Sequence, residues 1–149
     1  MKNISFLILF NLVATSFIYA QVKTDDNQSQ AIYSLIDQYS QAREKRDTVL
    51  LKSILTTDID QLVSSGEWRS GLKESTTGMM RSSAGSPGAR TLKIEKIRFL
   101  NAACGIVDAR YEIQNADGSL RKMWSTFIVV DQKNGWKISA IRNMLPAAQ

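Results

Sequence analysis

From residue 28 onward, apolar residues recur at the spacing of an α-helix. Between residues 28 and 46 they recur three, four and seven positions apart, at Ile32, Leu35, Ile36, Tyr39 and Ala42. This spacing places them on one stripe of a helix that packs against a core. The pair Asp47-Thr48 breaks the pattern and can cap a second short helix over residues 49–55. Two helices in series are therefore expected to open the domain.

A small hairpin and a third helix are expected next. Residues 62–64 and 67–69 are short β-like segments on either side of Ser65-Gly66, which we interpret as a two-residue turn that places Trp68 opposite Val63. Residues 72–81 have helical composition. Residues 82–88 are rich in Ser, Gly and Pro, which is typical of a loop.

From residue 91 onward the apolar period becomes two, which is typical of β-strands. The segments are 91–100, 105–113, 120–130 and 136–143, and a phase shift at Glu95-Lys96 suggests a β-bulge. Asp117-Gly118 and Asn134-Gly135 are strong hairpin turn signals. Helices followed by a run of strands predict an α+β fold, with the helices packed on one face of a curved antiparallel sheet.

Two-residue turns would fix the register of the last three strands. One face would then carry Tyr111 opposite Trp124, and Ala109 opposite Thr126, with Asn143 next in that row. Such a face is apolar with a few isolated polar groups, as ligand pockets are. The alternative is a closed core in which Thr126 and Asn143 satisfy each other.

The opposite face would carry Asp108, Arg110, Phe127 and Arg142 among further apolar residues. Too much of this face is apolar for a sheet surface in contact with water. We interpret it as a subunit interface in which Asp108 and the arginines fix the register. Partial cover by the N-terminal segment of the same chain is the alternative.

Composition removes several classes of function. The chain has 149 residues, 44% of them hydrophobic and 22% charged, which is ordinary for one globular domain. It has no histidine, which excludes imidazole bases, Ser-His-Asp and Cys-His nucleophiles, and histidine-dependent metal sites. Its one cysteine, Cys104, cannot form an intrachain disulfide. No metal and no cofactor are expected, because no cluster of metal-ligating residues is evident in the sequence.

The positive charge is dispersed along the chain. The formal net charge is +5, but the basic runs 43–46 and 93–98 are interrupted by acidic or apolar residues. We interpret both runs as solvated faces and expect no nucleic-acid partner.

The first twenty residues have the three-part form of a secretory signal peptide. Lys2 precedes an apolar run over residues 4–19, and Ala20 is a small residue before the expected cut. We expect cleavage there, export to the periplasm or beyond, and no stable membrane anchor afterwards. An uncleaved anchor is the alternative. Residues 21–30 are then a flexible segment before a domain over residues 31–145.

Four segments together resemble the nuclear transport factor 2-like superfamily, in particular its SnoaL-like and SgcJ-type branch. They are Arg46-Asp47, the Thr-Asp-Ile-Asp of 57–60, the Ser-Gly-Glu-Trp-Arg-Ser-Gly of 65–71, and residues 135–143. The resemblance covers about residues 31–145. It implies a cone-shaped, strongly curved antiparallel sheet with about three N-terminal helices packed on its concave side. It also implies a pocket at the open end and a homodimer formed through the sheet.

Members of this superfamily include ketosteroid isomerase, polyketide cyclases and dehydratases. In isomerase-like members a carboxylate shortly before the glycine of the first hairpin is the general base. The matching stretch here, residues 62–66, is Leu-Val-Ser-Ser-Gly and holds no carboxylate. Proton abstraction needs a base within hydrogen-bond reach of the substrate.

We therefore expect an exported domain whose apolar pocket binds a small hydrophobic molecule without an identifiable catalytic base. The alternatives are an isomerase, cyclase or dehydratase acting on a hydrophobic substrate, and a dimerisation module with a filled cone. The candidate ligand-binding residues are Tyr39, Trp68, Tyr111, Trp124, Thr126 and Asn143. The candidate interface residues are Asp108, Arg110, Phe127 and Arg142.

Overall fold

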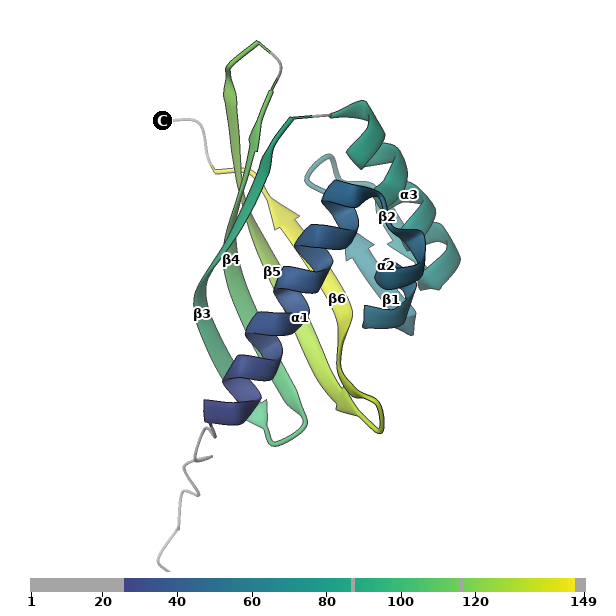
Figure 1. The fold of residues 1–149 in the computed structure, drawn as a ribbon, viewed down its shortest axis with the longest axis vertical. Coiled ribbons are helices and arrows are strands. Elements are labelled where there is room, and N and C mark those ends of the chain that lie inside the picture. Colours follow the sequence, from purple (N-terminus) through teal and green to yellow (C-terminus); the bar gives the residue numbers. More distant parts are fainter. Residues whose placement is uncertain (1–25, 87, 116, 147–149) are drawn as a thin grey trace, which may run out of the picture.

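The computed structural model describes residues 26–86, 88–115 and 117–146, which form three helices and one six-stranded sheet (Figure 1). The expected signal peptide lies outside the described residues. The helices are α1 (Asp26–Lys45), α2 (Thr48–Ile54) and α3 (Gly71–Gly85). The strands are β1 (Leu55–Leu62), β2 (Trp68–Ser70), β3 (Arg90–Asn101), β4 (Cys104–Gln114), β5 (Leu120–Gln132) and β6 (Gly135–Met144). The expected α+β fold and the order of its elements are confirmed.

The sheet curls around α1, and its strand order is β2-β1-β6-β5-β4-β3 (Figure 1). All neighbouring strands are antiparallel except β1 and β6, which are parallel. The expectation of a purely antiparallel sheet is therefore wrong. Parallel neighbours require a long crossover connection, here the whole stretch from β2 to β5, so no local turn signal announces the pairing.

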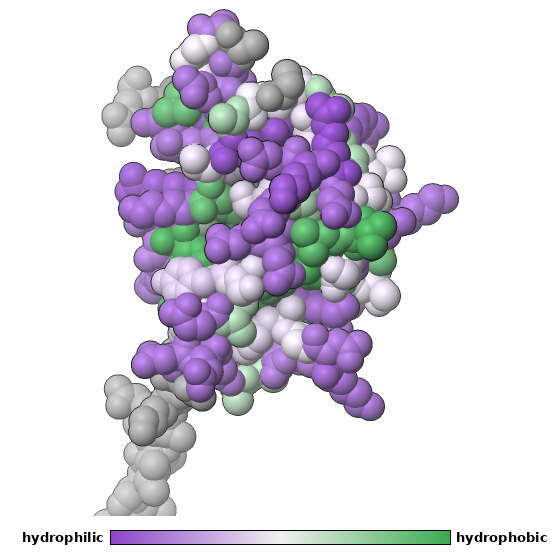
Figure 2. Space-filling view, in the orientation of Figure 1, coloured by the Kyte–Doolittle hydropathy of each residue, from purple (hydrophilic) through white to green (hydrophobic). Residues whose placement is uncertain are grey.

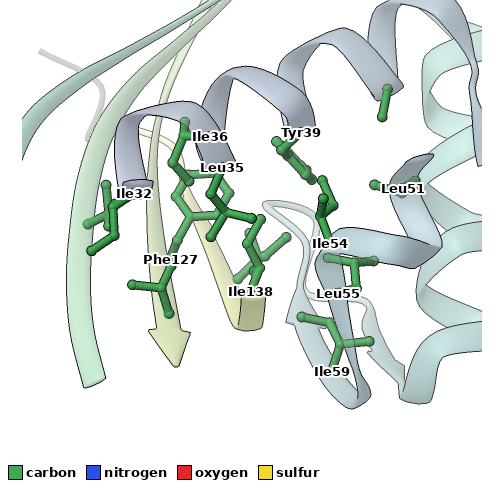
Figure 3. Close-up of a cluster of buried hydrophobic side chains, with 14 of the residues drawn as sticks. Ile32, Leu35, Ile36, Tyr39, Leu51, Ile54, Leu55, Ile59, Phe127 and Ile138 are labelled. Carbon is green, nitrogen blue, oxygen red and sulfur yellow. The ribbon is translucent and has the colours of Figure 1, made fainter. Parts of the chain in front are cut away.

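The apolar stripe of α1 packs onto the sheet and fills the lower part of the curl. Figure 3 shows the side chains of Ile32, Leu35 and Ile36 directed toward Phe127 and Ile138 on the strands. The ring of Tyr39 meets the ring of Phe127 edge to face, with 5.3 Å between centroids. The predicted inward stripe of this helix is confirmed. Each fully buried aliphatic side chain of this cluster contributes about 1.5–3 kcal/mol.

Helix boundaries agree with the sequence only in part. Asp47 caps α2, and its carboxylate accepts a hydrogen bond from the Leu50 amide at 2.9 Å, as predicted. In contrast, α1 already begins at Asp26, inside the segment 21–30 that was expected to be flexible. Similarly, α3 continues to Gly85, through half of the loop expected over 82–88. The bulge expected near Glu95 is confirmed by a register shift between β3 and β4.

The face of the molecule that carries α1 is mostly hydrophilic, with hydrophobic side chains gathered in the region of α2 (Figure 2). Val49 on that helix is 81% exposed. Across the described residues, none of the helices combines the length and the apolar character that a membrane crossing requires.

The register of β5 differs by one residue from the expected one. Tyr111 lies opposite Met123 rather than opposite Trp124. The reason is the turn: the Asn115 amide donates to the Ser119 carbonyl at 2.8 Å, so the connection is one residue longer than a two-residue turn. A two-residue type I′ turn needs positive φ at both central residues, but only Gly118, at φ 80°, adopts it, and Asp117 does not.

The other two hairpins deviate as well. The turn between β5 and β6 lies one residue earlier than expected, with Gln132 opposite Gly135, and a register shift between Ile128 and Val129 leaves Thr126 opposite Arg142. In the first hairpin the Val63 amide donates to the Glu67 carbonyl at 2.9 Å, and Trp68 lies opposite Leu62 rather than Val63. In each case the turn glycine has a positive φ and its neighbour before it does not.

A slip of one residue exchanges the two faces of a strand. We call the face that packs on α1 the helix-covered face, and the other one the outer face. Phe127 and Ser125 lie on the helix-covered face, opposite Ile141 and Asn143 of β6, while Trp124 and Thr126 lie on the outer face. The expected grouping of Tyr111, Trp124, Thr126 and Asn143 is therefore wrong. The placement of Phe127 at a subunit interface is also wrong, since it is 1% exposed in the core.

Candidate ligand-binding cavity

A cavity of about 70 Å³ lies on the helix-covered face, where the ends of α1 and α3 approach the sheet near the β4–β5 turn. This is the upper end of the molecule in Figure 1. A water needs roughly 10–15 Å³ of such space, so several waters or a small head group fit. Its lining residues are Arg43, Gln61, Val63, Ser64, Arg69, Ser82, Ser86, Arg90, Tyr111, Ile113, Arg121, Met123 and Asn143. Larger depressions of about 460 and 470 Å³ lie elsewhere, along α1 with the β5–β6 turn and along α3.

Arg43 reaches this cavity from the inward stripe of α1. It is 5% exposed, and its Nε donates to Ser83 Oγ at 2.9 Å while Nη1 donates to Tyr39 Oη at 2.7 Å. Burial raises the pKa of Tyr39, and the neighbouring guanidinium offsets part of that rise. Burial lowers the pKa of Arg43 while the two tyrosines Tyr39 and Tyr111 raise it, and the net direction is upward. The group therefore stays charged.

In the described part of the chain no Asp or Glu forms an ion pair with Arg43. Its charge is compensated by the hydroxyls of Tyr39 and Ser83 and by the ring of Tyr39, whose centre lies 5.7 Å from the guanidinium carbon. Burying a cation without a countercharge costs several kcal/mol. The burial of Arg43 therefore costs folding free energy that a purely structural role would not require.

Arg69 enters from β2, where it alternates with the exposed Trp68, and is 4% exposed. It donates to both carboxylate oxygens of Glu67, at 2.9 and 3.1 Å, and also to Gln61 Oε1 at 3.3 Å and Ser82 Oγ at 3.2 Å. These hydrogen bonds from Arg69 hold the pKa of Glu67 below its usual range. Glu67 is therefore ionised and engaged beside the cavity, outside its lining.

Arg90 and Arg121 complete the cationic side. Arg90 donates to the carbonyls of Ser83, at 3.4 Å, of Gly88, at 3.3 Å, and of Ser86, and so ties β3 to the end of α3. Its Nε is buried and has no hydrogen-bond partner within the described residues. Arg121 is exposed and donates to Ser64 Oγ at 2.8 Å, linking β5 to the first hairpin.

Apolar groups also line the cavity, namely Val63, Ile113, Met123 and the ring of Tyr111. They are interleaved with the cations, since Ile113 lies opposite Arg90 on one neighbouring strand and opposite Arg121 on the other. None of the described residues that line the cavity is an Asp or a Glu. The lining of this cavity is therefore amphipathic, and differs in this respect from the apolar pocket expected from the sequence.

Of the six predicted ligand-binding residues, Tyr111 and Asn143 line the cavity. The amide oxygen of Asn143 accepts a hydrogen bond from Ser125 Oγ at 2.8 Å, and Thr126 bonds to Asp108, so the alternative in which Thr126 and Asn143 satisfy each other is wrong. Tyr39 is buried behind Arg43 and positions it. The remaining three, Trp68, Trp124 and Thr126, lie on the outer face and are not brought to the cavity.

The outer face gathers three of the four predicted interface residues. Asp108 accepts a hydrogen bond from Thr126 at 2.7 Å, and the Arg110 guanidinium lies 5.4 Å from the centre of a Trp124 ring. Arg142 donates to both carboxylate oxygens of Asp60, at 2.9 and 3.1 Å, and lies 4.8 Å from a ring centre of Trp68.

Sequence reasoning missed the arginines. Arg43 lies four residues after Tyr39, which continues the inward stripe, but its position in the basic run 43–46 led to its interpretation as solvated. That interpretation is wrong for Arg43, whereas the other three residues of the run are exposed. Arg69 follows the exposed Trp68 on a strand, where neighbouring side chains point to opposite faces. This alternation was the signal that could have placed Arg69 inside.

A metal site finds no support among residues 26–86, 88–115 and 117–146. They contain no group of three or more Cys, Asp or Glu side chains placed to hold a metal ion.

Comparison with known proteins identifies the fold. No protein-family model and no curated protein matches the sequence. Solved structures do match, at low identity. A domain of unknown function with a cystatin-like fold from Nostoc punctiforme is 15% identical, with a TM-score of 0.74 over 84% of this chain and 81% of its own.

Two further structures carry the same fold. A member of the nuclear transport factor 2-like family from Streptomyces avermitilis, to which a dehydratase function has been ascribed, is 15% identical with a TM-score of 0.71, over 84% of this chain and all of its own. A nuclear transport factor 2-like protein from Novosphingobium aromaticivorans is 12% identical with a TM-score of 0.70, over 83% and 84%. The chain therefore has the nuclear transport factor 2-like fold, in its cystatin-like arrangement of helices on a curled sheet.

Proposed function

We propose that this chain is an exported domain that binds a small amphipathic molecule in the cavity between α1, α3 and the sheet. The observation that carries the proposal is the lining, which combines buried polar groups with apolar side chains in one partly open cavity. Pockets that hold small molecules are built in this way, with a few placed polar groups fixing the orientation. Export rests on the apolar run that precedes Ala20.

Binding fits the cavity better than proton-abstracting catalysis. The carboxylate nearest to the lining by its hydrogen bonds, Glu67, is engaged through both oxygens by Arg69. A carboxylate held in this way is a weak base, because the hydrogen bonds stabilise its charged form. An isomerase or dehydratase reaction would need a base directed at the substrate, and the cavity walls offer guanidinium, hydroxyl and amide groups instead.

The proposal is tested by a fragment screen on ¹⁵N-labelled protein, read from backbone amide shifts. We expect bound fragments to shift amides of cavity residues such as Tyr111 and Asn143. Ser64→Trp, which places an indole at the half-buried rim, is expected to abolish these shifts. Ser65→Trp is the matched control, because Ser65 is exposed and outside the lining. Fragments that shift only residues remote from the cavity, in the native protein, would refute the proposal.

We further propose that a second copy of this chain covers the outer face. Trp68, Trp124 and Met144 are exposed there, at 53%, 38% and 50%. Charges of both signs, Asp108 and Arg110, lie among them. A two-fold contact brings the same patch against itself, so a patch that holds both signs is self-complementary.

A further inference from the structure

We infer that the molecule bound in this cavity is an organic anion whose acidic head group is held by Arg43. This inference rests on the proposed function and names the class of ligand. The head group is a carboxylate or a tetrahedral oxyanion such as a phosphate, and a short apolar body contacts the apolar side chains of the lining.

The positive charge at the cavity exceeds the negative charge. Four arginines line it, and the one carboxylate among the described residues that pairs with any of them, Glu67, lies outside the lining. Glu67 is also shared with Arg81, at 3.5 Å. The charge of Arg90 is compensated by the carbonyl groups at the end of α3, because the C-terminal end of a helix favours cations. Arg43 and Arg121 have no such compensation within the described residues, so a negative charge in the cavity would complete the balance.

Several guanidinium donors at the cavity are unused. A guanidinium has five N–H donors, and Arg43 uses one at Nε and one at Nη1. Among the described residues nothing accepts from its Nη2. The buried Nε of Arg90 also has no acceptor there. Oxygen atoms of an anion are acceptors only and suit these donors, and the planar fork of a guanidinium matches a carboxylate or phosphate.

A structural role alone does not require the charge of Arg43. Its hydrogen bonds go to the hydroxyls of Tyr39 and Ser83, which neutral donors also bind. Buried charges are usually paired, yet Arg43, which is 5% exposed, has hydroxyl groups and the ring of Tyr39 rather than a carboxylate as its neighbours within the described residues.

The size and lining of the cavity fit a small organic anion. About 70 Å³ accommodates a head group with a few carbon atoms but not an extended lipid. Val63, Ile113 and Met123 line the cavity beside the arginines, and an apolar body in contact with them would be desolvated. Arg121, exposed at the rim, is placed to attract anions from solution.

The inference is tested by calorimetric and amide-shift titrations of the protein with butanoate, with butanamide and with inorganic phosphate. Butanamide has nearly the shape of butanoate but no charge. We expect butanoate to shift the amides of cavity residues and to bind at least about tenfold more tightly than butanamide. The phosphate arm separates the two head groups: tighter binding of phosphate than of butanoate assigns a tetrahedral oxyanion, and the reverse assigns a carboxylate.

Three arginine variants locate the site. Arg43→Gln is expected to remove the preference for the anion, while Arg98→Gln, the same change of charge at an exposed position on β3 outside the lining, is expected to leave it intact. Should Arg43→Gln not fold, Arg121→Gln decides the matter, since Arg121 is exposed. Its loss is expected to weaken butanoate severalfold, and an unchanged affinity would count against the inference.

The failures of the two proposals are distinguishable. If butanamide binds the cavity as tightly as the anions, or if neither anion shifts cavity amides while neutral fragments do, the anion inference is overturned and small-molecule binding stands. If neither the anions nor any fragment of the screen shifts cavity amides, both are overturned.

Discussion

Gly78 on α3 lies directly against the guanidinium-bearing side chain of Arg69 on β2. A Cβ at position 78 would lie 2.6 Å from Cδ of Arg69 and nearer still to its Nε. Real Cβ atoms do not approach other atoms so closely, so the side chain would have to move. A glycine within a helix costs about 1 kcal/mol relative to alanine. Here that cost is offset by the space it leaves for a buried arginine at the cavity.

Gly78→Ala is therefore expected to destabilise the protein although alanine favours the helix. Displacing Arg69 would disturb its hydrogen bonds to Glu67, Gln61 and Ser82, and this loss is expected to outweigh a helix gain of about 1 kcal/mol. We expect the free energy of unfolding in urea to fall. Gly85→Ala in the same helix is the control, because a Cβ there meets nothing within 4 Å. A Gly78→Ala protein as stable as the native one would contradict this account.

Arg43→Met is expected to raise stability in the absence of an anion. The substitution removes a buried charge without a countercharge, which relieves a desolvation cost of several kcal/mol. It also leaves the hydroxyls of Tyr39 and Ser83 without this partner, at about 1–3 kcal/mol. We expect a net gain of roughly 1 kcal/mol in urea unfolding, accompanied by loss of anion binding. A loss of stability of similar size would instead make Arg43 a structural residue of the core.

The ionisation of Glu67 makes the free energy of unfolding depend on pH. Its pKa lies below the ordinary value, chiefly because Arg69 donates hydrogen bonds to it, so its stabilising effect is present above the pKa of the unfolded chain. That effect is lost as the pH falls through the lower pKa of the folded state. Glu67→Gln is therefore expected to destabilise the protein at neutral pH. The difference in stability from the native protein should shrink once the pH falls below the ordinary pKa of glutamate and vanish below the lowered pKa of the folded state.

The measurement is urea unfolding of both proteins across this range of pH. Glu44→Gln, at an exposed position on α1, is the control for the change in net charge. A difference between native and Glu67→Gln proteins that stays constant from neutral to acid pH would mean that the Glu67–Arg69 contact contributes nothing to folding.

The elements of this fold could be predicted because their signals are local. The stripe of α1, the cap at Asp47 and the bulge near Glu95 each depend on neighbours in sequence. The parallel pairing of β1 with β6 depends on residues about eighty positions apart, such as Leu62 and Arg142, and no local pattern encodes it.

The candidate site was predicted less well because it depends on the turn geometry. Asp117-Gly118 signals a hairpin correctly, but one glycine supports only one positive φ, and the connection is a residue longer than a type I′ turn. That single residue moves Trp124 and Thr126 from the helix-covered face to the outer face. The buried arginines were missed because charged residues are almost never fully buried unless paired, so sequence reasoning places them in solvent.

Substitutions on the two faces of β5 are expected to have different effects. Trp124 lies on the outer face, so Trp124→Asp is expected to dissociate the proposed dimer and to leave the monomer folded. Phe127, three residues further along the strand, is 1% exposed and contacts Tyr39. Its replacement by Ala creates a cavity at a cost of about 3–5 kcal/mol, and Phe127→Asp should not fold at all.

Sedimentation equilibrium gives the oligomeric state of each protein, and circular dichroism shows whether it is folded. Tyr33→Asp on α1 is the matched control, because Tyr33 is 44% exposed on the side of the molecule away from the outer face. We expect the native chain and Tyr33→Asp to be dimers at micromolar concentration and Trp124→Asp to be a folded monomer, because an aspartate in a desolvated contact lacks a partner. A native chain that is monomeric under these conditions would refute the dimer. A folded Phe127→Asp protein would instead refute the register of β5, and with it the assignment of Ser125 and Asn143 to the cavity side.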